Sequence, residues 1–227
     1  MLDGRWRTDF ERAMRPVGSS LHRSGVSADH LTLLGIGMSF LAAVAIGNGA
    51  LRAGVLLLAL TAFPDVLDGA VAKASGTASS RGAFFDSVAD RLTDALLLGG
   101  VAWYLAGTGS HIVVLPMAVL GASMLISYER AKAESLGFNA RGGIMERAER
   151  LVALGIGLLF DSLLVPVLWV MLALTLFTAV QRFDRVWRQA ANAPVPVPLG
   201  MRWRSRRVAR SRPTARAWRQ RARTRRS

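Results

Sequence analysis

The hydrophobic positions of the chain gather in long runs without charge, separated by short charged stretches. Three runs contain no Asp, Glu, Lys or Arg, namely residues 31–51, 95–128 and 162–181. A helix needs roughly 20 apolar residues to cross a bilayer, and the middle run is long enough for two crossings with a break at "AGTGSH". The pattern therefore predicts an all-α integral membrane protein. Its six transmembrane helices are expected near 28–48, 52–75, 82–106, 111–133, 145–160 and 162–184.

The N-terminal segment has a different periodicity. Arginines occupy the other faces of the predicted helix. Large apolar side chains recur there every three or four positions: Trp6, Phe10, Met14, Val17 and Leu21. Such a pattern is typical of an amphipathic helix that lies on a membrane surface. We therefore predict three parts. These are a juxtamembrane surface helix over 1–23, a six-helix transmembrane domain over 24–188 and a disordered Arg-rich tail over 189–227.

Charge adds an orientation to this picture. Of the net charge of +14, the 12 arginines of residues 201–227 supply 12, which leaves +2 for the rest of the chain. This tail either attracts anionic lipid headgroups or stays solvated and fixes topology, and without a base-reading motif it predicts no nucleic-acid partner. Arg and Lys concentrate in alternate connections, so the positive-inside rule places both termini on the cytoplasmic side of a cell membrane. Because the chain has no Cys, disulfides and thiolate metal sites are excluded.

Four aspartates interrupt the apolar pattern within "PDVLDGAVAKASGTASSRGAFFDSVADRLTD", residues 64–94. Asp65 and Asp68 lie three apart near the end of the second predicted span, and Asp86 and Asp90 lie four apart near the start of the third. Each pair occupies one helical face, so the pairs can meet in an antiparallel hairpin. Converging carboxylates repel one another, and two divalent cations would neutralise them. All-oxygen ligation suits Mg²⁺, with Mn²⁺ as an alternative.

A simpler interpretation of the same acids stays open. They would then be ordinary helix-end charges near water, paired with basic neighbours: Lys73, Arg81 and Arg91. The spacing of the whole stretch favours the metal site, because it reads D-x2-D-G-x2-A-K-x8-G-x3-D-x3-D from Asp65 to Asp90. This resembles the signature of the CDP-alcohol phosphatidyltransferase family, D-x2-D-G-x2-A-R-x8-G-x3-D-x3-D. The single departure is Lys73, which stands where the family usually has Arg.

The resemblance, which extends over residues 1–188, implies a function for the transmembrane domain. Family members are six-helix membrane enzymes that transfer a phosphatidyl group from a CDP-linked lipid, here CDP-diacylglycerol, to an alcohol with release of CMP. It implies two metal ions held by Asp65, Asp68, Asp86 and Asp90, with Asp90 also taking the proton of the alcohol. The residues expected along the CDP-lipid are Ala28, Asp29, His30, Leu31, Gly69, Lys73 and Ser79. Membrane lipids are further expected partners, and a homodimer is a candidate assembly.

A basic connection at 127–151 suggests the acceptor. Its charges are expected on the same side of the membrane as the aspartates, and Arg binds phosphate through paired donors. A phosphorylated acceptor is therefore expected at Arg130, Lys132, Arg147, Arg150 and Arg182. The alternative is that these residues only flank the membrane and set topology.

The same segment is similar to a branch of the family, the actinobacterial phosphatidylinositol phosphate synthases. These carry S-Y-x-K-A-R-A-E, then G-G-[hydrophobic]2-E-R-x-E-R-L and V/I-Q-R, where this chain has "SYERAKAE", "GGIMERAERL" and "VQR". The similarity implies transfer to inositol phosphate, giving phosphatidylinositol phosphate, with an active site on the cytoplasmic side. Glycerol 3-phosphate or another alcohol as acceptor is the alternative within the class. Cation transport through the acidic hairpin is the alternative outside it.

Overall fold

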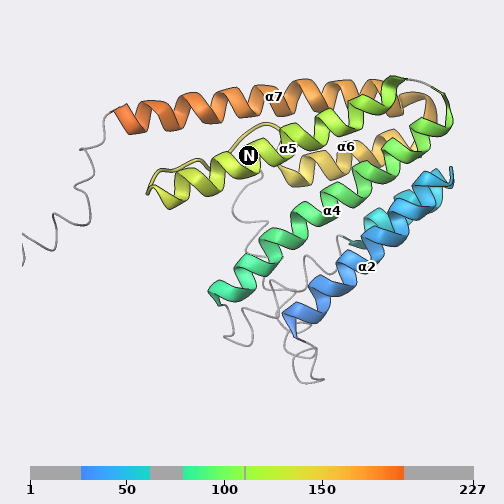
Figure 1. The fold of residues 1–227 in the computed structure, drawn as a ribbon, viewed down its shortest axis with the longest axis horizontal. Helices are drawn as coiled ribbons and strands as arrows, with labels where there is room; N and C mark the ends of the chain where they lie inside the picture. Colours follow the sequence, from blue (N-terminus) through green and yellow to red (C-terminus); the bar gives the residue numbers. More distant parts are fainter. Residues whose placement is uncertain (1–26, 62–78, 110, 192–227) are drawn as a thin grey trace, which may run out of the picture. The chain divides into compact units, whose positions relative to one another are not determined.

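The computed structural model describes residues 27–61, 79–109 and 111–191, and the regular structure within these ranges is all helical (Figure 1). The helices are α2 (Ala28–Gly47), the helix Leu51–Thr61, α4 (Ser80–Gly107), the short 3-10 helix η1 (His111–Val113), α5 (Val114–Ser135), α6 (Arg147–Leu159) and α7 (Asp161–Ala191). The all-α prediction is confirmed for the part of the chain described. Each of the six predicted spans overlaps one of these helices.

Side-chain caps explain where α2 and α4 begin. Ser27 Oγ accepts a hydrogen bond from the His30 amide, and the Ser27 amide donates to His30 Nδ1, each at 3.3 Å. Ser79 Oγ accepts from the Gly82 amide at 3.1 Å in the same way. These bonds satisfy amides that have no partner inside the helix. Arg81 lies 3.9 Å from Asp29, so the first turns of the two helices are neighbours.

Small residues allow α2 and α4 to pack closely side by side (Figure 1). A Cβ atom on Gly100 would lie 2.7 Å from the carbonyl oxygen of Ala43, a distance that leaves no room for any side chain. Gly47 similarly lies against the ring of Trp103. Close backbone approach of this kind is typical of helix pairs in membrane proteins. It fixes the position of α4, the helix that carries the acidic residues.

The other helices close around one apolar core. Gly157 of α6 packs against Leu164 and Val167 of α7, and Leu58 reaches Gly155 of α6. At the far end of α4, the Tyr104 hydroxyl donates to Asp161 Oδ1 at 3.0 Å, which ties α4 to the start of α7. The largest fully buried apolar side chains are Ile46, Leu97, Leu158, Leu164, Leu168, Met171, Val101 and Val119.

The connection between α5 and α6, residues 136–146, is folded onto α7. Gly137 and Gly142 have φ of +84° and +88°, a conformation that glycine adopts without steric cost. The Met145 amide donates to Thr178 Oγ1 at 3.2 Å, and Gly143 lies directly on the Thr178 methyl group. These contacts decide where α6 starts and therefore where Arg147 is presented.

Two helices of the described residues are long and apolar enough to cross a membrane, Asp29–Gly47 and Asp161–Ala191. The first half of α4 carries several charges, and α6, with 13 residues, is about 20 Å long at 1.5 Å per residue. Six complete crossings therefore stay a prediction. The predicted surface helix over 1–23, the tail beyond 191, and Asp65, Asp68, Gly69 and Lys73 lie outside the described residues.

The chain divides into two compact units, Met1–Trp187 and Arg188–Ser227. All the contacts discussed below belong to the first unit. Of the second, the structure describes only 188–191, the end of α7.

Candidate active site

The acidic residues of α4 form the first part of the site. Asp86 and Asp90 are one helical turn apart and share a face of α4. Asp90 is engaged at both oxygens, with Arg147 Nη1 at 2.8 Å from Oδ1 and Arg91 Nη1 at 3.1 Å from Oδ2. Within the described ranges no three His, Cys, Asp or Glu residues converge. The part of the predicted metal site that the structure describes is thus one carboxylate pair.

A fifth aspartate, Asp94, lies one turn further along the same face and was not predicted as a site residue. It is only 7% exposed. Arg150 Nη2 lies 2.9 Å from its Oδ2, and Arg147 Nε lies 3.6 Å from its Oδ1. A buried carboxylate is costly unless it is paired and hydrogen-bonded, and these two arginines supply that partner. The signal was present in the sequence, since Asp94 continues the four-residue spacing of Asp86 and Asp90 beyond the end of the family signature.

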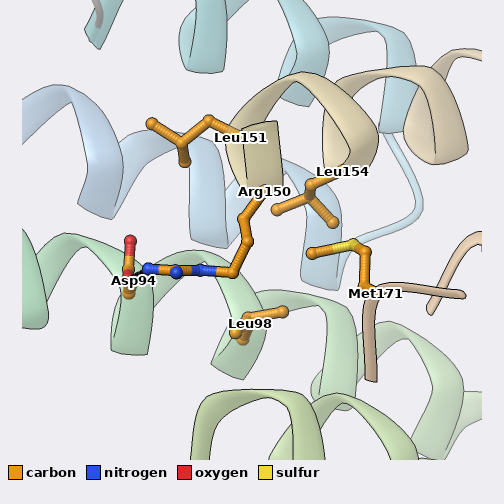
Figure 2. Close-up of a pocket in the computed structure, with 6 residues that line it drawn as sticks. All are labelled: Asp94, Leu98, Arg150, Leu151, Leu154 and Met171. Atoms are coloured by element: carbon orange, nitrogen blue, oxygen red, sulfur yellow. Dashed lines mark hydrogen bonds and ion pairs between the residues drawn. The ribbon is translucent and has the colours of Figure 1, made fainter. Parts of the chain in front are cut away.

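Arg150 is held from two sides. It is 6% exposed, and besides its bond to Asp94 it donates from Nη1 to the carbonyl of Met145 at 3.3 Å. Figure 2 shows its guanidinium extended from α6 toward the Asp94 carboxylate of α4. A cavity of about 10 Å³ adjoins the pair, walled by apolar side chains: Leu98, Leu151, Leu154 and Met171.

Arg182 reaches a different set of partners. Its guanidinium is 4% exposed and donates from Nη1 to the carbonyl of Ile126 at 2.7 Å and from Nη2 to that of Gly142 at 3.3 Å. Nη2 also lies 3.7 Å from Glu146. Arg182 therefore joins α7 to α5 and to the 136–146 connection. Its Nε is buried without a hydrogen bond among the described residues.

The remaining predicted acceptor residues lie on the surface of α5. Arg130 pairs with Glu134 one turn along the helix at 3.1 Å, and Lys132 is exposed. The structure thus brings Arg147 and Arg150 to the acidic face of α4. Arg182 is connected to them indirectly, through Glu146, the neighbour of Arg147.

The described residues predicted to contact the CDP-lipid have mainly local structural partners. The His30 ring and the Ser79 hydroxyl cap their helices, Asp29 lies near Arg81, and Leu31 is buried in the core. The two capped helix starts are adjacent, and exposed amides at helix N-termini favour anions. A Cβ atom on Gly82 would contact only Ser79 Oγ, at 3.5 Å, among the described residues.

Comparison with known proteins identifies the family. The sequence profile of the CDP-alcohol phosphatidyltransferases matches residues 26–181. The chain is 36% identical over 208 residues to the phosphatidylinositol phosphate synthase of Streptomyces avermitilis, and the aligned region covers 85% of each protein. The chain belongs to the CDP-alcohol phosphatidyltransferase family, as its aspartate signature predicted, and is therefore a transferase.

Solved structures agree with this assignment. The fold is similar to the phosphatidylinositol phosphate synthase of Mycobacterium tuberculosis with CDP-DAG bound, at a TM-score of 0.75 and 30% identity over 82% of this chain and 100% of that one. A second crystal structure of the same enzyme, in complex with manganese and citrate, matches with a TM-score of 0.73 and 30% identity over 82% of this chain and 94% of that one.

The donor chemistry of the site fits divalent cations and phosphate. Carboxylate oxygens are the ligands of hard cations such as Mg²⁺ and Mn²⁺. Guanidinium groups bind phosphate through paired donors. Asp90 and Arg147 are in direct contact, so a side chain suited to bind metal and a side chain suited to bind phosphate are neighbours in one site.

Proposed function

We propose that this protein transfers the phosphatidyl group of CDP-diacylglycerol to inositol phosphate, giving phosphatidylinositol phosphate and CMP. The observation that carries the proposal is the contact of Arg147 with Asp90 at 2.8 Å, because it joins the basic connection to the last acid of the family signature. The relatives from Streptomyces avermitilis and Mycobacterium tuberculosis support the choice of acceptor, since both are phosphatidylinositol phosphate synthases that match most of this chain.

Divalent cations complete the site in this proposal. Asp65, Asp68, Asp86 and Asp90 would hold two Mg²⁺ ions, or Mn²⁺ in their place. Support comes from the all-oxygen donor set and from the manganese complex of the Mycobacterium tuberculosis enzyme. Bound metal would neutralise the pyrophosphate and stabilise the charge that develops on the leaving CMP.

The protein side chains would position the acceptor and move its proton. Arg147 would bind the phosphate of inositol phosphate, with Arg130, Lys132, Arg150 and Arg182 nearby. This holds a hydroxyl of the acceptor next to Asp90, and such positioning lowers the barrier by removing the entropy cost of encounter. Asp90 accepts the hydroxyl proton while the oxygen bonds to the lipid-side phosphorus. The bond from that phosphorus to the CMP oxygen then breaks.

The CDP-lipid would lie at the paired starts of α2 and α4. Asp29, His30 and Ser79 lie at these helix starts, and Ala28, Gly69 and Lys73 complete the predicted set. Support comes from the 3.9 Å approach of Asp29 to Arg81, which makes the two helix starts neighbours. Their capping bonds use some of the free amides, and the rest can face an anion.

The surface supports a location within a membrane. Large apolar side chains of α2 and α7 are more than half exposed, in contrast to the small apolar patches of soluble monomers: Leu33, Leu34, Phe40, Leu41, Trp169, Val170, Phe177 and Val180. A lipid environment would cover them. We propose a multi-pass protein of the cell membrane with both termini and the active site on the cytoplasmic side, as the loop charges predict.

An acceptor panel tests the proposed function. Purified protein in detergent receives CDP-diacylglycerol and Mg²⁺ together with inositol phosphate, glycerol 3-phosphate or inositol, and released CMP is measured. We expect CMP with inositol phosphate, none after chelation of the metal, and a loss of at least about 100-fold in rate in the Asp90→Asn variant. CMP release with glycerol 3-phosphate alone would remove the inositol assignment. Cation flux in liposomes without any CMP release would favour transport instead.

A further inference from the structure

We propose that Asp94 is a positioning residue for the acceptor, which is itself fixed by Arg150 and holds Arg147 in the orientation that binds the acceptor phosphate. The inference rests on the proposed function and goes beyond it, since Asp94 lies outside the family signature. It follows from a chain of contacts between α4 and α6 and from the burial of the carboxylate.

The contacts connect both arginines to a single carboxylate. Asp94 Oδ2 accepts from Arg150 Nη2 at 2.9 Å, while Oδ1 lies 3.6 Å from Arg147 Nε. Arg147 continues to Asp90 Oδ1 through Nη1 at 2.8 Å. Arg147 thus bridges two carboxylates one turn apart on α4.

Burial separates the residue that meets the substrate from the residue that orients it. The side chain of Arg147 is 22% exposed, compared with 9% for that of Asp94. The apolar wall formed by Leu98, Leu154 and Met171 leaves a cavity of about 10 Å³ beside Asp94, at most the room for one water molecule. An inositol phosphate cannot enter that space. Arg150, whose side chain is only 7% exposed, lines the same cavity. Asp94 therefore acts through Arg147, and Arg150 fixes Asp94.

The buried ion pair of Asp94 and Arg150 is better explained by a role in positioning than by a contribution to stability. A buried ion pair contributes little to stability compared with apolar side chains of the same volume, because both charges lose their hydration. Its advantage is geometric, since the planar guanidinium of Arg150 is fixed at Nη1 by the Met145 carbonyl and at Nη2 by Asp94. Arg150 thereby holds the Asp94 carboxylate in place, and a preorganised Arg147 guanidinium loses less rotamer freedom when it binds phosphate.

Asp94→Asn tests the proposal, because it keeps the size of the side chain and removes its charge. We expect the KM for inositol phosphate to rise roughly 10- to 100-fold, the range that follows from weakening one charge-assisted contact. The kcat and the KM for CDP-diacylglycerol should stay within about twofold, since those depend on other residues. At the same concentration of inositol phosphate, the increase in melting temperature should be smaller than in the wild type, while that caused by CDP-diacylglycerol is unchanged.

Asp161→Asn is the matched control. Asp161 also ties an end of α4 to another helix through its carboxylate, by the hydrogen bond from Tyr104, but it lies at the opposite end of α4. We expect wild-type kinetic constants for this variant. If both carboxylates only join helices, the two variants should have the same kinetic constants. That result would overturn the proposal. So would an Asp94→Asn enzyme with wild-type KM values.

A double variant covers the case in which Asp94→Asn alone fails to fold. Asp94→Asn/Arg150→Gln removes both charges of the pair and leaves neither buried alone. If Asp94 and Arg150 act on Arg147 as one unit, the double variant should have a KM for the acceptor within about threefold of that of Arg150→Gln. A KM near the product of two independent losses would contradict the proposal. The KM is measured for whichever phosphorylated alcohol the wild type consumes. An error in the proposed acceptor is then seen with the wild type, and an error in the role of Asp94 is seen in the ratios of variant to wild-type KM.

Discussion

Replacing Arg182 separates a role in holding the fold from a role in binding phosphate. The guanidinium is buried and donates to two main-chain carbonyls, those of Ile126 and Gly142. A hydrogen bond from a charged donor contributes about 1.5–3 kcal/mol. Removing the charge also removes the cost of burying it, so Arg182→Met should lower the free energy of unfolding by about 2–4 kcal/mol. For a protein of this size the melting temperature should fall by roughly 4–16 °C.

The assay is thermal unfolding of the purified variant in detergent, beside the KM for inositol phosphate in the enzyme that remains folded. Arg185→Met is the matched control, because Arg185 lies one turn further along α7 and donates to the Arg141 carbonyl at an exposed position. Water replaces that bond, so we expect a fall of less than about 2 °C. An Arg182→Met protein that melts like the wild type but needs far more inositol phosphate would refute the role of Arg182 in holding α7 to α5. It would make Arg182 a direct phosphate ligand.

Three further predictions follow from packing, loop charge and the tail. Gly100→Ala should destabilise the protein by about 1–3 kcal/mol through its clash with α2, whereas Gly99→Ala, with nothing within 4 Å of the new Cβ, should not; equal melting temperatures would contradict the close α2–α4 packing. In this Cys-free chain, Thr108→Cys should react with an impermeant reagent outside intact cells and Ser135→Cys should not, and the reverse labelling would overturn the topology. Truncation after Gly200 should leave turnover in detergent intact; a truncated protein that binds CDP-diacylglycerol without turnover would show that the tail takes part.

The positions of the helices were predictable because the sequence marks them locally. Uncharged runs predicted a first span over 28–48 and a last one over 162–184, and the structure has α2 at Ala28–Gly47 and α7 at Asp161–Ala191. The start of the third span was expected at residue 82, and α4 begins two residues earlier because Ser79 caps it through the Gly82 amide. The span predicted for the short α6 had the weakest apolar pattern of the six, because only residues 151–160 are free of charge there.

The partners of the charged residues were less predictable, because they depend on helices that are distant in sequence. Arg150 and Asp94 are 56 positions apart, and so are Arg182 and Ile126. The basic pattern of 127–151 indicated a pocket, but it could not show which arginines face the acids and which face main-chain carbonyls. Asp94 was missed because the family signature ends at Asp90, although the helical spacing continues.

The central claim is that the acidic face of α4 and the arginines beside it transfer a phosphatidyl group to inositol phosphate. The most direct measurement is competition in liposomes that contain CDP-diacylglycerol, with Mg²⁺ and equal amounts of inositol phosphate and glycerol 3-phosphate. Mass spectrometry then identifies the lipid product. We expect phosphatidylinositol phosphate as the main product, in equal amount to the CMP released, and its loss in Asp90→Asn. Phosphatidylglycerol phosphate as the main product, or CMP release that survives in Asp90→Asn, would contradict the account.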